Sequence, residues 1–188
     1  MRPRKITAVI SIAITLLSLS FYVFDKAAVD AIPRSNVLKG HKQSNGGDVN
    51  ILLLGLDSRR DNNGNDLPRK LLDLMHVGSS SAVGGYNTNT MILIHIPANG
   101  SHAVAISIPR DDYVDVAGWG MQKIKEAYGL AKYDSENALI KKGIPNPLRE
   151  KESRDAGRAL TISTITTLLG VPIDHFAEVN PCWFLLFS

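Results

Sequence analysis

Residues 49–56, VNILLLGL, are the segment that best indicates how this chain folds. Only Asn50 interrupts the apolar run, and a short continuous run of this kind is typical of a β-strand that is buried on both faces. The charged sequence DSRRD, residues 57–61, follows the run directly. Because open α/β sheets bind ligands where their strands end, the segment predicts an α/β fold with a candidate site after residue 56.

The sequence on the C-terminal side of this strand predicts further strands and helices. In chain order these are a helix over 67–76, strands over 91–96 and 103–108 joined by a turn at 97–101, helices over 122–132, 135–142 and about 150–169, and a strand over 173–179. The last helix is expected to end at Gly170, since glycine followed by Pro172 is a common helix stop. This mixture predicts a mixed sheet with flanking helices.

A second charged segment follows the predicted strand over 103–108, at Arg110, Asp111 and Asp112. If the two strands are neighbours in the sheet, both charged segments face one cleft. Arginine makes charge-assisted hydrogen bonds with phosphate oxygens, and Mg²⁺ takes carboxylate and phosphate oxygens. The segments are therefore candidates for a phosphate and metal site. Arg–Asp ion pairs at a solvated sheet edge would give the same sequence pattern.

The N-terminal segment over 6–24 carries no charge across 19 residues, close to the length of a membrane-spanning helix. Basic residues within 1–5 favour a cytoplasmic tail, so the segment predicts a single-pass protein of the cell membrane whose domain is extracytoplasmic. The polar residues 25–48 are expected to form a linker, and residues 49–188 the domain. A signal peptide cleaved near residues 29–31 is the alternative, and a buried soluble helix is a third interpretation.

The composition excludes several classes of protein. The net charge of +3 comes from 21 Lys and Arg against 18 Asp and Glu, which is too weak and scattered to indicate a nucleic-acid partner. The single cysteine, Cys182, excludes an internal disulfide framework and a cysteine-based zinc site. The sequence has no HExxH, G-x-S-x-G, G-x-x-x-x-G-K-[ST] or strand-following G-x-G-x-x-G motif. Zinc hydrolases, α/β-hydrolases and nucleotide-binding enzymes of these types are not indicated.

Five segments resemble the LytR-CpsA-Psr family of cell-wall transferases, and they occur in the order found in that family. They are VNILLLGLDSR (49–59), TNTMILIHIPANG (88–100), AVAISIPRDDYVDV (103–116), KIKEAYGLA (123–131) and LLGVPIDHFAEVN (168–180). The combination of SIPRD with GVPIDHF is specific. The segments DNNGNDLP and GGYNTNT resemble the actinobacterial branch, and the whole resemblance covers about residues 48–180.

The resemblance implies a membrane-anchored enzyme that acts on the outer face of the membrane. Members of the family take a glycopolymer from its polyprenyl-pyrophosphate carrier and attach it to peptidoglycan through a phosphodiester. Mg²⁺ is the implied cofactor. The implied partners are the polyprenyl-pyrophosphate glycopolymer, the peptidoglycan acceptor and the membrane. The implied fold is an α/β sheet with a hydrophobic tunnel for the lipid tail.

Matching positions also imply the site residues. Arg110 and Asp111 are implied as catalytic, Asp57, Arg59, Asn87 and Lys123 as substrate-binding, and Asp57 and Asn89 as metal-binding residues. The family commonly has Arg-Ser-Asp where this chain has Asn87-Thr88-Asn89, so amides replace a guanidinium and a carboxylate. The family domain also continues beyond residue 180, and the apolar residues 181–188 are consistent with a truncated core, a docked strand or a partner site. A catalytically inactive fragment and a non-catalytic cell-envelope binding protein are therefore alternatives.

Overall fold

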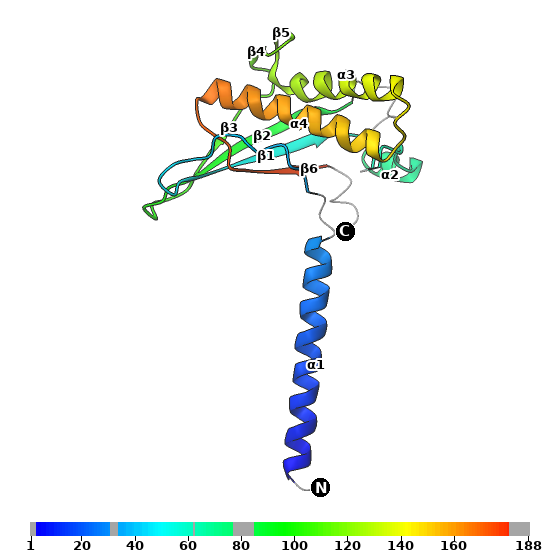
Figure 1. Ribbon diagram of the computed structural model, residues 1–188, viewed down its shortest axis with the longest axis vertical. Helices are drawn as coiled ribbons and strands as arrows, with labels where there is room; N and C mark the ends of the chain where they lie inside the picture. Colours follow the sequence, from blue (N-terminus) through cyan, green and yellow to red (C-terminus); the bar gives the residue numbers. More distant parts are fainter. Residues whose placement is uncertain (1–2, 31–33, 62, 77–84, 181–188) are drawn as a thin grey trace. The chain divides into compact units, whose positions relative to one another are not determined.

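The structure is a computed structural model that describes residues 3–30, 34–61, 63–76 and 85–180. The chain divides into two compact units at residue 35. Helix α1 (Pro3–Asp30) belongs to the first unit (Figure 1). The sheet and the remaining helices belong to the second unit.

Helix α1 continues to Asp30, beyond the boundary predicted at residue 24. Its described apolar side chains are exposed, and Leu17 and Phe21 are each 73% accessible. Within the part of the chain that the structure describes, no helix is both long and apolar enough to cross a membrane. The membrane span over 6–24 therefore stays a prediction.

Residues 36–48, which were expected to continue the linker, belong to the second unit. Val37 and Leu38 pack against its hydrophobic core. The carboxylate of Asp174 accepts hydrogen bonds from the backbone N–H and the hydroxyl of Ser44, both at 2.6 Å. This part of the segment is therefore attached to the domain, through contacts that its polar composition does not reveal.

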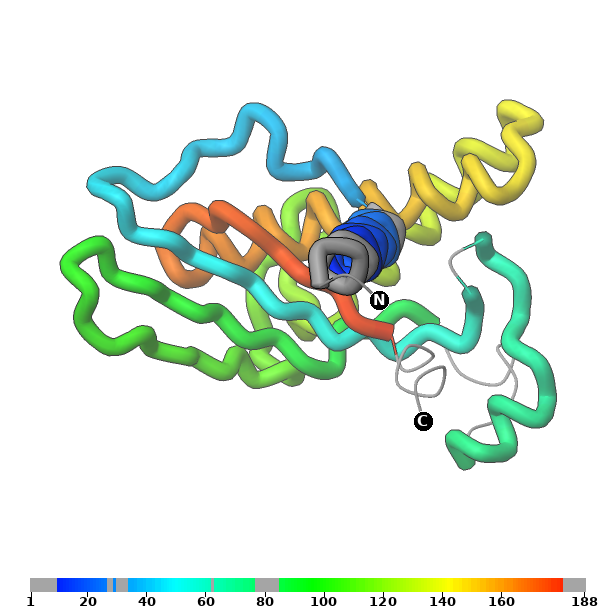
Figure 2. The backbone as a smooth tube through the Cα atoms, turned by 90° about the horizontal axis from the view of Figure 1, so that it is seen from below, coloured from blue at the N-terminus to red at the C-terminus, as the bar shows by residue number. Residues whose placement is uncertain are grey.

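The second unit is built on a four-stranded mixed sheet, as predicted. Its strands are β1 (Val49–Asp57), β2 (Asn87–Ile96), β3 (Val104–Ser107) and β6 (His175–Val179), in the order β3-β2-β1-β6. β2 is antiparallel to β1 and β3, whereas β6 runs parallel to β1 (Figure 2). The hairpin and the returning strand that the sequence predicts are confirmed.

Within the described residues of the second unit, two long helices pack on one face of the sheet (Figure 1). These are α3 (Ala127–Lys141) and α4 (Leu148–Leu169). Leu52 and Leu54 of β1 point toward them and pack with Ile165 of α4. The alternate residues of β1 are only half-buried, so the prediction that this strand is buried on both faces is wrong here. The sequence run is continuous because the less covered face is apolar as well.

A single helix, α3, replaces the two helices predicted over 122–132 and 135–142. The helix continues through Tyr133 and Asp134, which lie between the two predicted helices, and the adjacent Lys132 is buried against α4. The first part of the predicted segment forms β5 (Gly120–Lys123), which pairs with β4 (Tyr113–Val116), and a 3₁₀ turn, η1 (Ile124–Glu126). This short hairpin has no counterpart among the predicted elements.

The other predicted helices are confirmed. α4 ends at Gly170, whose φ of 69° is the left-handed conformation that glycine adopts readily at a helix end. α2 (Arg69–Leu74) lies inside the helix predicted over 67–76. The contact between α3 and α4 depends on Gly157, since a Cβ at this position would lie 2.7 Å from Cδ1 of Tyr128. The apolar residues 181–188 lie outside the described residues.

Candidate functional site

The site begins where β1 and β2 leave their regular pairing. The ladder shifts beyond Gly55 and leaves Asn89 in a β-bulge. Bulges re-aim side chains, and here the amide nitrogen of Asn89 donates a hydrogen bond to Oδ2 of Asp57 at 3.1 Å. The two residues that were expected to bind a metal are therefore in direct contact.

Arg110 joins this pair from the turn that follows β3. Its Nη1 donates to Oδ1 of Asn89 at 3.2 Å, and its Nε lies 3.5 Å from Oδ2 of Asp111. The N–H of Ile108 donates to the carbonyl of Met91 at 2.9 Å, which holds the start of this turn against β2. The two charged segments that follow the predicted strands therefore meet, although β1 and β3 are not neighbours as the prediction required. Both strands run antiparallel to β2, which lies between them, so they end at the same edge of the sheet.

Two lysines flank Asp111. Nζ of Lys125 lies 2.8 Å and Nζ of Lys123 3.2 Å from its Oδ1. Hydrogen bonds from Lys125 and Lys123 lower the pKa of Asp111 to about 2. The carboxylate therefore stays ionised near neutral pH, where it orients its cationic neighbours and is a poor proton acceptor.

Lys125 is absent from the residues that the sequence implied. Its backbone explains its position: its N–H donates to the carbonyl of Arg110 at 3.2 Å, and its carbonyl accepts a hydrogen bond from the hydroxyl of Thr88 at 3.3 Å. The signal in the sequence is only its spacing of two residues from Lys123. In the structure Lys123 ends β5 and Lys125 lies in η1, and with this geometry residues two apart place both side chains beside Asp111.

We call the residues brought together here the charged cluster, which consists of Asp57, Asn89, Arg110, Asp111, Lys123 and Lys125. Asn87 lies opposite Asp57 in the strand ladder. Arg59 follows two residues after Asp57, and its carbonyl accepts a hydrogen bond from the N–H of Leu67 at 3.0 Å. Asn87 is therefore the strand partner of a cluster residue, and Arg59 is close to one in the sequence. The cations of the cluster outnumber its carboxylates, which suits an anionic ligand.

An apolar hollow of about 460 Å³ adjoins the charged cluster. Leu53, Ile92 and Val179 contribute apolar side chains to its lining, and Asp57 and Asn89 contribute polar ones. In the strand ladder Leu53 pairs with Ile92, whereas Asp57 lies at the end of β1. Side chains alternate along a strand, so this lining belongs to the face of β1 that the helices do not cover. A charged surface and an apolar surface are therefore contiguous.

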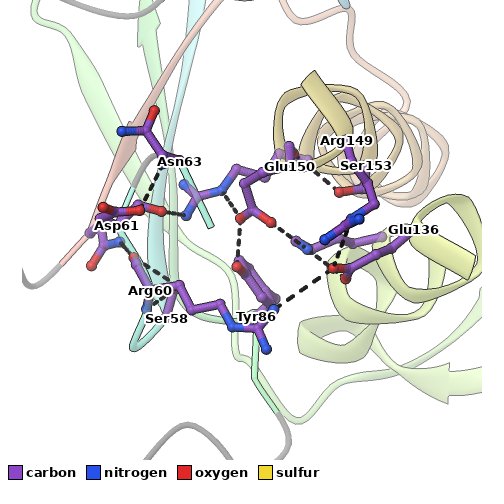
Figure 3. A network of polar contacts seen from close by, with 12 residues as sticks. Ser58, Arg60, Asp61, Asn63, Tyr86, Glu136, Arg149, Glu150 and Ser153 are labelled. Carbon is purple, nitrogen blue, oxygen red and sulfur yellow. Dashed lines mark hydrogen bonds and ion pairs between the residues drawn. The ribbon is translucent and has the colours of Figure 1, made fainter. Parts of the chain in front are cut away.

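A buried ion network lies between the sheet and the two helices (Figure 3). Its centre is Glu150, whose Oε1 accepts hydrogen bonds from the hydroxyl of Tyr86 at 2.5 Å and from Nε of Arg154 at 2.8 Å. Nζ of Lys132 lies 3.0 Å from Oε2 of Glu150 and 2.9 Å from Glu136. Burial alone would raise the pKa of Glu150, but the hydrogen bonds from Tyr86 and Arg154 bring it below its ordinary value.

Sequence reasoning missed this network. Charged residues on helices are usually solvated, so nothing in the sequence marks Lys132, Glu150 and Arg154 as buried. A second contact supports the same region, where Nη2 of Arg154 donates to the carbonyl of Asp61 at 3.1 Å. The network therefore connects α3 and α4 with the segment that follows β1.

Comparison with known proteins supports the resemblance. The family model LytR_cpsA_psr matches residues 20–182. The cell wall biosynthesis protein LcpA of Corynebacterium glutamicum is 34% identical in an alignment 193 residues long, gaps included. The alignment covers 98% of this chain and 36% of LcpA. The polyisoprenyl-teichoic acid–peptidoglycan teichoic acid transferase TagU of Oceanobacillus iheyensis is 40% identical over 132 residues, which cover 70% of this chain and 28% of TagU.

Among solved structures, the chain is similar to TagT with bound octaprenyl pyrophosphate lipid, with 21% identity and a TM-score of 0.45 over 76% of this chain and 39% of that one. TagT of Bacillus subtilis is 22% identical, with a TM-score of 0.43 over 76% of this chain and 38% of that one. The chain spans between 27% and 36% of the length of three curated relatives. Because the family model matches most of its residues, the chain belongs to the LytR-CpsA-Psr family.

Proposed function

We propose that this chain acts in cell-wall assembly as a membrane-anchored, Mg²⁺-dependent transferase that attaches a polyprenyl-pyrophosphate-linked glycopolymer to peptidoglycan through a phosphodiester. The observation that carries the proposal is the contact between the charged cluster and the apolar hollow. A lipid pyrophosphate needs both surfaces side by side, one for its charged head and one for its apolar tail. The names of LcpA and TagU support the same cell-wall function.

The charged cluster offers cations that a pyrophosphate can reach. Arg110 is 52% exposed and Lys123 is 49% exposed at the side chain. A guanidinium binds two phosphate oxygens at once, whereas a lysine acts as a point charge. Arg110 would therefore orient the pyrophosphate, and Lys123 would add charge beside it.

The residues present are compatible with Mg²⁺ held jointly by the protein and the substrate. In the described residues, no group of three or more His, Cys, Asp or Glu side chains could hold a metal by itself. Mg²⁺ usually keeps several waters and takes one or two carboxylates together with phosphate oxygens. Asp57 would supply such a carboxylate, and Asn89 would orient it through their hydrogen bond. When bound, Mg²⁺ would neutralise part of the phosphate charge.

In the proposed reaction, an acceptor hydroxyl oxygen forms a bond with the phosphorus that carries the glycopolymer. The bond between that phosphorus and the bridging oxygen of the pyrophosphate breaks, and polyprenyl phosphate leaves. The hydroxyl proton is released to the solvent, and Asp111, which pairs with both lysines, would orient Lys123 and Arg110. Phosphoryl transfer relies mainly on positioning and charge stabilisation, which Arg110 and Lys123 would provide.

Membrane anchoring through α1 is part of the proposal. Its support is the continuous helix over the apolar segment, with exposed side chains such as Leu17 and Phe24. The full chain should stay with the membrane fraction after extraction with alkaline carbonate. Leu17→Arg should release it, because a charge at the centre of a span is costly. Release of the unmodified chain would contradict an anchor.

The test of the proposed function measures ligand binding and then transfer. Titration calorimetry of the full chain with Mg²⁺ and geranylgeranyl pyrophosphate in detergent should detect binding. Arg110→Ala should weaken it about 10-fold or more, since charged hydrogen bonds are lost. Arg69→Ala is the matched control, because Arg69 is 77% exposed on α2 and pairs with Asp73.

Transfer of a lipid-linked glycopolymer to peptidoglycan by the same chain completes the test. Transfer that depends on Arg110 would support the transferase. Binding without transfer would favour a non-catalytic binding protein of the cell envelope. No binding of the probe by the unmodified chain would overturn the proposed function.

A further inference from the structure

Tyr86 has a backbone conformation that is unfavourable for its residue type. It lies directly before β2 with a φ of 68°. Residues with bulky side chains rarely adopt this left-handed region, and they keep it only where the surrounding structure holds them there. Outliers of this kind are concentrated near functional sites. The contacts that hold Tyr86 therefore bear on the charged cluster next to it.

Buried contacts hold the side chain of Tyr86. Its ring lies parallel to that of Tyr128, with 6.3 Å between centroids and 4° between planes. Its hydroxyl donates to Oε1 of Glu150 at 2.5 Å (Figure 3). Nζ of Lys132 lies 4.1 Å from the ring centroid. These partners belong to α3 and α4, so the side chain of Tyr86 is fixed to the helical layer.

The backbone of Tyr86 contacts the site itself. Its N–H donates to the carbonyl of Asp57 at 2.9 Å. The next residue, Asn87, is the ladder partner of Asp57, and Asn89 donates to the Asp57 carboxylate. One residue therefore connects the buried ion network with the pair that begins the charged cluster.

We propose that Tyr86 is a positioning residue that transmits the geometry of the buried ion network to the pair formed by Asp57 and Asn89, and so sets the affinity of the charged cluster for a Mg²⁺-bound pyrophosphate. The statement that Tyr86 sets the affinity rests on the proposed function, whereas the statement that it positions Asp57 and Asn89 does not. Without its hydroxyl, Tyr86 loses the polar tether that keeps its backbone left-handed. The start of β2 then relaxes away from Asp57, although Tyr86 touches no substrate.

The test uses the full chain with Tyr86→Phe, which keeps the ring and removes only the hydroxyl. Tyr133→Phe is the matched control, because Tyr133 lies on α3 and is 66% exposed. NMR spectroscopy in detergent measures hydrogen exchange of the residue-86 amide and the resonances of the Asn89 side-chain amide, both without ligand. Titration calorimetry with Mg²⁺ and geranylgeranyl pyrophosphate measures affinity.

We expect Tyr86→Phe to accelerate exchange of the residue-86 amide about 10-fold, to shift the Asn89 resonances and to weaken probe binding about 5-fold, because one positioned hydrogen bond is lost. Tyr133→Phe should change none of these. Parent-like exchange and resonances in Tyr86→Phe would overturn the inference even if its melting temperature falls, because Tyr86 would then only fill space. Parent-like affinity together with altered resonances would overturn the part on affinity.

Two further results separate the possible causes of failure. If the unmodified chain binds no probe, the proposed function fails and so does the part on affinity, while the NMR comparison still decides the positioning role. If Tyr86→Phe does not fold, the double variant Lys132→Met with Glu150→Leu takes its place, because it removes the acceptor of the Tyr86 hydroxyl without leaving Lys132 unpaired. Unchanged exchange at residue 86 in this double variant would overturn the inference.

Discussion

Lys132 and Glu150 form an ion pair across the contact between α3 and α4, with 3.0 Å between Nζ and Oε2 and side chains that are each 1% exposed. The two atoms are not aligned for a hydrogen bond, so Oε2 of Glu150 has no hydrogen-bond partner within the described chain. Its stabilisation is therefore electrostatic, in a place where water cannot replace the cation. The hydrogen bonds to Oε1 satisfy the other half of the carboxylate.

Lys132→Met should destabilise the fold, because it removes the cation that faces Oε2 of the buried Glu150 carboxylate. We expect a loss of about 3 kcal/mol in the free energy of unfolding, measured with urea. The double variant Lys132→Met with Glu150→Leu should recover part of this loss, since it removes both charges of the pair while Arg154 keeps its contact with Glu178. Lys70→Met on the exposed surface of α2 is the control. A loss below 1 kcal/mol in the single variant would show that the pair does not matter for stability.

Gly157→Ala should disturb the packing of α3 on α4. The added Cβ would lie 2.7 Å from Cδ1 and 2.8 Å from the carbonyl oxygen of Tyr128, and the backbone atom cannot easily move. We expect a cost of about 2 kcal/mol, seen as a lower melting temperature. Gly85→Ala should be nearly neutral, since its Cβ would meet no atom within 4 Å. Equal melting temperatures for both variants would contradict the close helix contact.

Asp111 should titrate far below neutral pH. Its pKa of about 2 in the folded chain lies below its ordinary value of 3.8. The stabilisation by its lysines is therefore present above about pH 4 and is lost as the pH falls toward 2. Lys125→Ala should raise the pKa of Asp111 toward 3.8, as followed by carboxyl-carbon NMR, whereas Lys70→Ala should not. A midpoint that stays near 2 in Lys125→Ala would contradict the pairing.

Leu53→Lys should distinguish binding of the apolar tail of the ligand from binding of its pyrophosphate. Leu53 lines the apolar hollow, so a lysine there should weaken binding of geranylgeranyl pyrophosphate about 10-fold, as measured by calorimetry. Binding of isopentenyl pyrophosphate, which has a short tail, should change little. Val104→Lys is the control, because Val104 is 51% exposed on the edge strand β3. Equal losses for both ligands would indicate that the tail does not lie in the hollow.

Local sequence patterns were sufficient for the elements that depend on them. The apolar run in β1 and the periodic apolar residues of α4 predict their own structures, and Gly170 predicts the end of its helix. These elements could be predicted because chain neighbours determine them. The charged residues after two strands made Asp57 and Arg110 candidates for one site, but the order of the strands in the sheet decides that they meet.

The sequence alone was thus enough for the mixed α/β sheet, the family and most members of the charged cluster, because apolar periodicity and motif order are written along the chain. Only the tertiary structure could decide which charged side chains are buried and how the side chains of the site are oriented. The bulge that points Asn89 at Asp57 depends on pairing between strands. The burial of Lys132 depends on α4, which lies later in the chain. Contacts between distant residues leave no local signal, and these contacts set the geometry of the site.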